Sequence, residues 1–471
     1  MHRREFIRNA CVLASSLVIG PATWAAKSEF PVVRVSEAKR KFKSAAVENC
    51  IRRIQSSISN RELAWMFGNC FPNTLDTTVD FEIVDGRPDT YVITGDIGAM
   101  WLRDSSAQVW PYLPLMRSEP ALQQLIAGVI NRQTACILKD PYANAFYKDA
   151  KKLSEWRSDQ TEMKPGVHER KWEIDSLCYP VRLAHGYWKA SGDALPFDQS
   201  WREAIALILQ TFREQQRMKG HGPYCFQRRT EVQSDTLAGN GYGRPGKPVG
   251  LICSMFRPSD DATVFPYLVP SNFFAVISLR QAAEMVEQIH HDSATASRCR
   301  CLADEVEQAL RQYAVVNHEK FGRIYAYEVD GYGNAYCIDD GNVPSLLSLP
   351  YLKAVTTDDE VYLNTRRFVL SDSDPYFCQG KAGSGQGGPH AGEGRIWPLG
   401  LIVQGITSTN EAEIRSCLDT LLATHAGTGF MHESFDKDEP RKYTRSWFAW
   451  ANTMFGEFIL KVFAERPQLL S

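Results

Sequence analysis

Apolar residues recur at helical spacing along most of this 471-residue chain, and this periodicity constrains the fold more than any other feature. Apolar side chains three and four residues apart lie on one face of an α-helix, which can then pack against a core. About eleven or twelve helices are expected, so the sequence predicts a mostly α-helical protein. The clearest helical segments are residues 46–54, 122–140, 201–212, 276–286, 302–313, 342–352, 396–405, 411–425 and 447–465.

One stretch departs from the helical pattern. Residues 81–94 read FEIVDGRPDTYVIT, with β-forming residues on both sides of Asp85-Gly86, and this predicts a short β-hairpin. Long polar and glycine-rich loops are expected at 238–248 and 379–394. Paired helices, one hairpin and long loops favour an α/α toroid, in which loops at one end build a pocket. The periodicity by itself establishes only the α-helical class.

The N-terminus has the pattern of an export signal. Arg3-Arg4 is followed by an apolar run at about 10–20 and then by small residues at 22–26. We therefore expect residues 1–26 to be a twin-arginine signal peptide and residues 27–471 to form a single catalytic domain, exported to the periplasm or secreted. The apolar run is short for a membrane span. All the remaining apolar stretches are interrupted by charged residues, so no membrane insertion of the mature protein is predicted.

Net charge limits the classes of binding partner, and the cysteine spacing limits the kinds of metal site. A net charge of -2 argues against nucleic acid or an anionic membrane as partner. Of the twelve cysteines, Cys11 falls in the leader, and the other eleven are scattered without the spacing of a zinc site. Most are expected to be small buried apolar residues. One or two disulfides are compatible with the sequence, which does not show which cysteines would pair.

Residues 94–112, TGDIGAMWLRDSSAQVWPY, combine the side chains that a sugar pocket needs. The carboxylates of Asp96 and Asp104 and the guanidinium of Arg103 can hold hydroxyl groups, while Trp101 can cover the apolar face of a pyranose. The alternative is an ordinary helix start, with Asp96 as its cap and Arg103-Asp104 as a surface pair.

Three further segments place carboxylates beside aromatic residues in the same way. They are residues 171–180 (KWEIDSLCYP), 256–272 (FRPSDDATVFPYLVPSN) and 429–450 (GFMHESFDKDEPRKYTRSWFAW). Glycoside cleavage needs a protonated carboxyl group and an ionised one across a single sugar site. Asp260-Asp261 and Glu433 are the candidates, although an Asp pair before a helix is also a common cap worth about 1 kcal/mol.

These four segments resemble the motifs of glycoside hydrolase family 125, the metal-independent exo-α-1,6-mannosidases, over residues 42–463. The resemblance implies an (α/α)6 fold and removal of terminal α-1,6-linked mannose from a glycan with inversion, without a metal or other cofactor. It places the general acid at Asp260, with Asp261 as the alternative, and the general base at Glu433. It also implies substrate contacts from the following residues: Asp96, Trp101, Arg103, Asp104, Trp172, Asp175, Asp261, Asn272, His432 and Trp447.

Other functions remain open at this level. A toroid also suits a glucoamylase-like or trehalase-like hydrolase, and the chain could be a glycan-binding protein without catalysis. The glycine-rich loop at 381–395 lacks the Walker spacing of a phosphate site, so we expect it to form a rim of the pocket. Its Glu393 is a second choice as a catalytic carboxylate.

Overall fold

Thirteen α-helices are the main secondary structure of the protein, in a computed structural model that describes residues 30–471. The expected signal peptide, residues 1–26, lies outside the described residues. The helices are α1 (Ala45–Gln55), α2 (Arg61–Cys70), α3 (Asn73–Thr77), α4 (Leu102–Val109), α5 (Pro120–Lys139), α6 (Ile174–Ser191), α7 (Gln199–Gln215), α8 (Val269–His290), α9 (Ser293–Tyr313), α10 (Glu360–Val369), α11 (Pro398–Ile406), α12 (Glu411–Thr424) and α13 (Ala449–Glu465). Six short 3-10 helices accompany them at Glu37–Lys39, Trp110–Tyr112, Met116–Ser118, Gln233–Asp235, Gly239–Gly241 and Pro467–Leu470.

The helices are of two kinds, inner and outer, which differ in burial. Every residue of α4 is buried, as are the first eight residues of α13 and nearly all of α11. The helices α1, α7, α9, α10 and α12 bury only one face. A helix buried all round belongs inside the fold, whereas an amphipathic helix covers it from outside.

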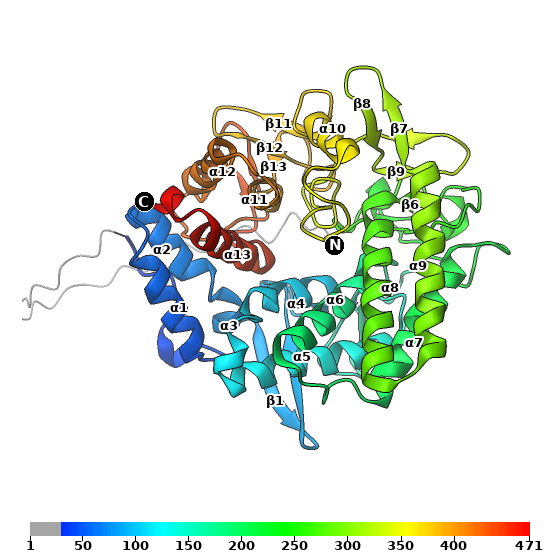
Figure 1. Ribbon diagram of the computed structural model, residues 1–471, viewed down its shortest axis with the longest axis horizontal. Helices are drawn as coiled ribbons and strands as arrows, with labels where there is room; N and C mark the ends of the chain where they lie inside the picture. Colours follow the sequence, from blue (N-terminus) through cyan, green and yellow to red (C-terminus); the bar gives the residue numbers. More distant parts are fainter. Residues whose placement is uncertain (1–29) are drawn as a thin grey trace, which may run out of the picture. The chain divides into compact units, whose positions relative to one another are not determined.

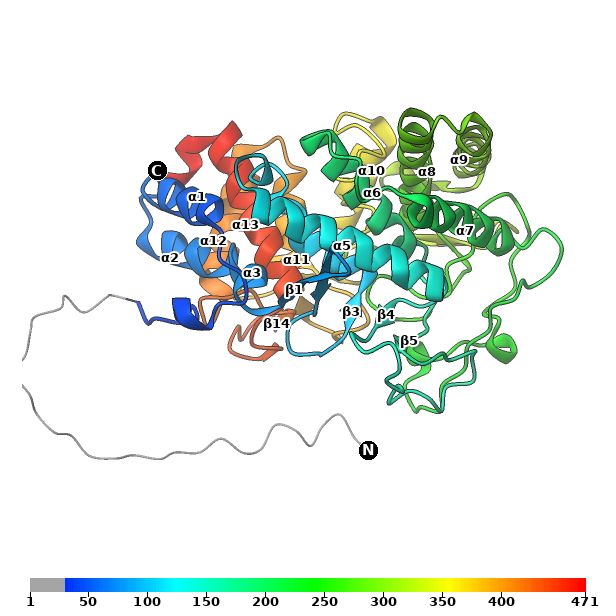
Figure 2. The same ribbon diagram turned by 90° about the horizontal axis from the view of Figure 1, so that it is seen from below.

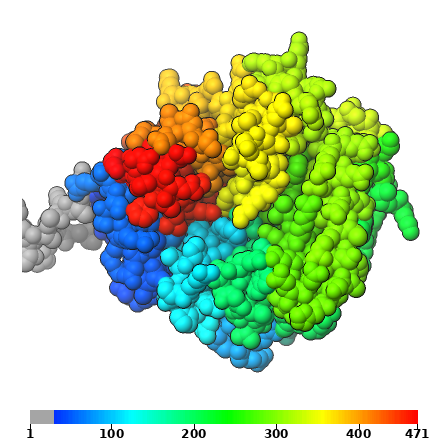
Figure 3. Space-filling model, viewed as in Figure 1, coloured from blue at the N-terminus to red at the C-terminus, as the bar shows by residue number. Residues whose placement is uncertain are grey.

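Inner and outer helices alternate along the chain from α4 to α9 and again from α10 to α13, and the buried turns at 342–352 lie between these two series. The inner helices α4, α6 and α8 pack in sequence, and α13 packs against both α4 and α11 (Figure 1). The outer helices α5, α7, α9 and α12 pack against the inner ones. The helix α2 contacts α13, and Ser59 N–H donates to Leu470 O at 2.9 Å, so the first helices of the described chain lie beside its C-terminal end (Figure 3). This arrangement confirms the predicted (α/α)6 toroid.

One predicted helix is wrong. Residues 342–352 form a series of turns, although their apolar residues have helical spacing and are buried. Pro344 and Pro350 have no backbone N–H and cannot continue a helix. The Asp339 carboxylate instead accepts hydrogen bonds from Leu346 N–H and Leu347 N–H, at 2.8 and 2.9 Å.

The strands are short, and most of them tie loops together. The predicted hairpin is confirmed as β1 (Val79–Val84) paired with β2 (Arg87–Val92). The strands β3, β6, β13 and β14 precede the inner helices α4, α8, α11 and α13, so short pairings hold the entry loop of each. The remaining pairings are β3 (Met100–Trp101), β4 (Ala145–Phe146) and β5 (Val167–Glu169); β6 (Tyr267–Leu268), β9 (Glu328–Val329) and β10 (Ala335–Tyr336); β7 (Val315–His318) and β8 (Gly322–Tyr325); β11 (Phe377–Gln379) and β12 (Ser384–Gln386); and β13 (Arg395–Ile396), β14 (Ser434–Asp436) and β15 (Tyr443–Thr444).

The strands at the helix entries gather on one side of the helices. Figure 2 shows β3, β4, β5 and β14 together on that side. The eleven cysteines of the described chain are all unpaired, and seven of them are buried. Within residues 30–471, no helix combines the length and the apolar character that crossing a membrane requires.

Candidate active site

A pocket opens where the entry loops of four inner helices meet. Its empty volume is about 390 Å³, part of which is open to solvent. Because the residues come from loops far apart in the sequence, only the toroidal fold brings them together. The lining residues are Thr94, Ile97, Trp101, Arg103, Asp104, Pro258, Ser259, Asp260, Asn342, His390, Trp397, Glu433, Arg445, Phe448 and Trp450.

Asp260 stands on a strained turn before β6. Its φ is +69°, in the left-handed region that residues other than glycine rarely adopt. Asp260 N–H donates to Arg257 O at 2.9 Å, and Arg257 N–H donates to Asp261 O at 2.8 Å. The buried Arg257 guanidinium is itself fixed to Glu328 at 2.7 Å. The turn is therefore held from several sides, and it leaves the Asp260 side chain 30 % exposed in the pocket.

Arg103 is surrounded by four carboxyl groups. Its Nη1 lies 2.5 Å from Glu173 Oε2 and 3.2 Å from Asp175 Oδ2. Its Nη2 lies 3.4 Å from Asp260 Oδ1, and its Nε lies 3.5 Å from Asp104 Oδ2. All but Asp260 are buried. Burial of several carboxyl groups around one guanidinium favours protonation of some of them.

The four carboxyl groups differ in how strongly they bind protons. Burial raises the pKa of Glu173 well above its usual value and raises the pKa of Asp175 to about 6. Burial would raise the pKa of Asp260 as well, but the positive charges of Arg103 and Lys171 outweigh it and lower that pKa. Within this group, the deeper carboxyl groups Glu173 and Asp175 therefore bind protons more strongly than Asp260 does.

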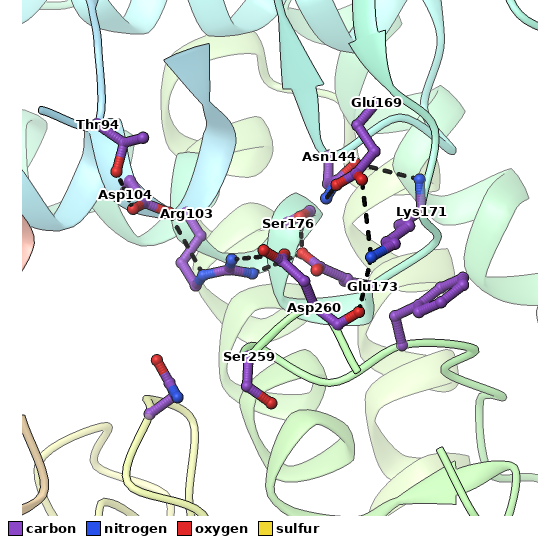
Figure 4. A network of polar contacts seen from close by, with 12 residues as sticks. Thr94, Arg103, Asp104, Asn144, Glu169, Lys171, Glu173, Ser176, Ser259 and Asp260 are labelled. Atoms are coloured by element: carbon purple, nitrogen blue, oxygen red, sulfur yellow. Dashed lines mark hydrogen bonds and ion pairs between the residues drawn. The ribbon is translucent and has the colours of Figure 1, made fainter. Parts of the chain in front are cut away.

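Lys171 holds the same turn from its other side. Its Nζ donates to the backbone oxygen of Asp260 at 2.9 Å and to Asp235 Oδ1 at 2.6 Å. The ammonium also lies 3.6 Å from Glu169 Oε1. Figure 4 shows Asp260 between Arg103 and Lys171, so that one cation acts on its carboxyl group and the other on its backbone.

Glu433 reaches the pocket from the residue before β14. Arg445 Nη1 lies 3.4 Å from Glu433 Oε1, and Arg445 Nη2 donates to Thr94 O at 2.9 Å and to the Asp96 carboxylate. The Glu433 side chain is 16 % exposed. Arg445 thus joins the stretch before α4 to the stretch before α13 and fixes the Glu433 carboxylate in place.

His390 brings the glycine-rich loop into the pocket wall. Its Nδ1 lies 3.2 Å from Asp261 Oδ1, and Asp261 is turned away from the pocket lining. Burial alone would lower the pKa of His390, but Asp261, Glu433 and Asp260 together raise it to about 9. The imidazole is therefore a cation at neutral pH. Glu393 of the same loop is exposed and does not line the pocket.

The structure brings five of the predicted site residues into one pocket lining. Two others lie directly behind it: Asp175 contacts Arg103, and the exposed Asp96 contacts Arg445. The five lining residues are Trp101, Arg103, Asp104, Asp260 and Glu433.

Four more predicted residues are absent from the lining: three of them are buried and support loops from within, and the fourth, Trp447, is half-buried. Trp172 is fully buried, and its Nε1 donates to Cys253 O at 2.7 Å. The Asn272 side chain is bound to the backbone of Ile252 and Leu268. His432 is buried on the ring of Tyr443, with centroids 3.8 Å apart. Trp447 packs beside Gly95.

Several lining residues were missed by the sequence reasoning, namely Asn342, His390, Trp397, Phe448 and Trp450. A usable signal exists for two of them. Trp397 and Phe448 stand immediately before α11 and α13, as Trp101 stands immediately before α4. An aromatic residue at the entry of an inner helix points into the pocket, and this rule would have found both.

Comparisons with known proteins identify the family of this chain. Residues 60–460 match the family described as metal-independent alpha-mannosidase (GH125). The chain is 41% identical over 458 residues to the meiotically up-regulated gene 157 protein of Schizosaccharomyces pombe, covering 93% of this chain and 90% of that protein. Within residues 30–471, no group of three His, Cys, Asp or Glu side chains is placed to hold a metal ion.

Solved structures show the same similarity. The fold matches a metal-independent α-mannosidase of Streptococcus pneumoniae, solved in a non-productive complex with α-1,6-mannobiose, with a TM-score of 0.86 and 42% identity over 90% of this chain and 100% of that one. A bacterial glucoamylase shares the fold alone, with a TM-score of 0.51 and 14% identity over 88% of this chain and 58% of that one. The chain therefore belongs to the metal-independent α-mannosidases of glycoside hydrolase family 125.

Proposed function

We propose that this protein is an exo-acting α-mannosidase that removes terminal α-1,6-linked mannose from a glycan with inversion of configuration. The observation that carries the proposal is the pair Asp260 and Glu433, two carboxyl groups from separate loops that line one pocket. Support for the substrate comes from the Streptococcus pneumoniae relative, which was solved with α-1,6-mannobiose.

The two carboxyl groups have complementary roles in this proposal. Asp260 protonates the glycosidic oxygen, and Glu433 takes a proton from a water that attacks the anomeric carbon from the opposite face. Single displacement needs room for that water, so we expect the two carboxyl groups to lie about 6.5–9.5 Å apart. The Glu433–Arg445 contact at 3.4 Å supports a fixed base.

The other lining residues suit the binding of one terminal sugar. Asp104 accepts from Thr94 Oγ1 at 2.7 Å through one oxygen, and its second oxygen has no hydrogen-bond partner among residues 30–471. Asp104 and Trp101 both line the pocket, and we expect them to contact mannose hydroxyl groups. Trp397 and Phe448 offer apolar surface for the sugar ring.

Export is a separate part of the proposal. The support for it is the Arg3-Arg4 pair followed by the apolar run and the small residues before Lys27. Export would expose the enzyme to glycans outside the cytoplasm. Replacing Arg3-Arg4 with Lys-Lys should retain the protein inside the cell, as measured by fractionation.

A panel of substrates tests the function. The purified protein is incubated, with a chelator, with α-1,6-, α-1,3- and α-1,2-mannobiose and with an aryl α-glucoside. Release of mannose from the 1,6-linked substrate alone is expected. Release of glucose would indicate a glucoamylase-like enzyme, and binding of mannobiose without turnover would indicate a glycan-binding protein. Loss of activity in chelator would contradict metal independence.

A further inference from the structure

Glu173 is a buried carboxyl group that the two-carboxylate mechanism leaves unused. It stands immediately before α6 and has no exposed surface. Its Oε2 accepts from Arg103 Nη1 at 2.5 Å and from Ser176 Oγ at 2.8 Å. Its Oε1 finds no hydrogen-bond donor among residues 30–471. Burying an ionised oxygen without a hydrogen-bond donor costs free energy, whereas a protonated carboxyl oxygen can itself donate a hydrogen bond.

The carboxyl group next to that of Glu173 belongs to Asp260. Figure 4 shows the two carboxyl groups next to each other beside the Arg103 guanidinium, which contacts Glu173 through Nη1 and Asp260 through Nη2. Glu173 is fully buried, while the Asp260 side chain is 30 % exposed. Water therefore stabilises negative charge on Asp260 and not on Glu173, and the shared proton stays on Glu173. Against the effect of burial, Arg103, Lys171 and His390 lower the pKa of Asp260, and the neighbouring Glu173 adds a smaller contribution.

We infer that Glu173 holds the proton that Asp260 delivers to the leaving oxygen, and passes it to Asp260 when a sugar fills the pocket. A bound sugar displaces the water around Asp260, so ionised Asp260 loses the solvation that Glu173 already lacks. Glu173 is then the better place for the negative charge, because Arg103 and Ser176 both donate to its Oε2. This inference rests on the proposed function and assigns Glu173 as a positioning residue.

The proton balance closes over one turnover. The O–H bond of Glu173 breaks as an O–H bond forms on Asp260. Asp260 then gives this proton to the glycosidic oxygen while the bond from that oxygen to the anomeric carbon breaks. A water oxygen bonds to the anomeric carbon and its proton goes to Glu433. Afterwards Glu433 releases its proton to solvent, and the Glu173–Asp260 pair takes one up.

The test compares two substrates in the variant Glu173→Gln. Glutamine keeps the size of the side chain and an acceptor for Arg103, but it has no acidic proton. Hydrolysis of α-1,6-mannobiose needs protonation of its leaving group, whereas 2,4-dinitrophenyl α-mannoside releases a stable phenolate without it. We expect kcat for mannobiose to fall by about 100-fold or more and kcat for the dinitrophenyl substrate to change far less. The alkaline limb of kcat/KM for mannobiose should also move to lower pH.

A half-buried glutamate outside the pocket serves as the matched control. Glu457 of α13 accepts from Trp110 Nε1 at 3.1 Å and from Tyr351 Oη at 2.9 Å. Glu457→Gln should keep the wild-type ratio of the two substrates and the wild-type pH profile. If Glu173→Gln does not fold, Glu173→Asp should retain an acidic proton at shorter reach and show the same substrate split in weaker form.

The outcomes separate the inference from the proposed function. Equal losses on both substrates, or an unmoved alkaline limb, in a folded Glu173 variant would overturn the proton-holding role. Failure of the wild-type protein to hydrolyse either substrate would instead overturn the proposed function.

Discussion

His390 Nδ1 lies 3.2 Å from Asp261 Oδ1, and this contact ties the glycine-rich loop to the turn that carries Asp260. Of the two adjacent aspartates, Asp261 is thus engaged by the histidine and Asp260 faces the pocket. The sequence left both as candidates for the acid. The contact favours Asp260, because a general acid must reach the leaving oxygen.

The His390–Asp261 contact should make the stability of the protein depend on pH. The pKa of His390 is raised in the folded state to about 9, from 6.5. A raised pKa means that the folded state binds the proton more tightly, so the stabilisation is complete below about pH 6.5 and is lost as the pH rises through about 9. Urea unfolding of wild type and His390→Gln at several pH values should show a difference that shrinks toward pH 10. A constant difference would contradict the ion pair.

Asparagine substitutions should separate the two aspartates. Asp260→Asn should lower kcat for α-1,6-mannobiose by about 10²–10⁴-fold, since the amide cannot protonate the leaving oxygen. Asp261→Asn should cost less, because it loosens only the contact with His390. Thermal unfolding shows whether both variants are folded. The reverse order of activities would assign the acid to Asp261.

Substitution of Arg445 should disturb the general base Glu433 more than substitution of Asp96, the exposed partner of Arg445. Arg445→Gln removes the contacts with Glu433 and with the Thr94 carbonyl, and a misplaced carboxylate can cost about 100-fold in kcat. Asp96→Asn breaks only the contact with Arg445 at an exposed site, so an effect of about 1 kcal/mol or less is expected. Steady-state kinetics on mannobiose measure both. Equal effects would mean that Arg445 acts through Asp96.

Two tryptophans of neighbouring motifs should behave differently. Trp172 belongs to the core, and Trp172→Ala should lower the free energy of unfolding by about 3–5 kcal/mol. Trp101 lines the pocket, so Trp101→Ala should mainly raise KM for mannobiose. Chemical unfolding and kinetics, compared for both variants, decide the matter. A raised KM with full stability in the Trp172 variant would place it at the sugar instead.

Apolar periodicity predicted the helices well because almost every helix here buries at least one face. It failed at residues 342–352, where the same spacing lies on buried turns closed by Asp339 and interrupted by Pro344 and Pro350. Spacing reports burial, and it does not distinguish a buried helix from a buried turn.

The sequence predicted which segments form the site, but not which side chains in each segment face the pocket. The motif segments identified entry loops of the inner helices, and three of the four segments contribute residues to the pocket lining. Within one segment, however, neighbours point in opposite directions: Trp172 goes into the core, while Glu173 goes to Arg103. His390 could not be found, because its role depends on a contact with Asp261, 129 residues away.

The anomer first released from α-1,6-mannobiose tests the central claim most directly. Proton NMR of the reaction, run in chelator, resolves the two anomers before they equilibrate. If Asp260 and Glu433 act by single displacement, β-mannose appears first, because the water attacks opposite the leaving group. If α-mannose appears first, the enzyme retains configuration, Glu433 cannot be a general base of this kind, and the proposed mechanism is wrong.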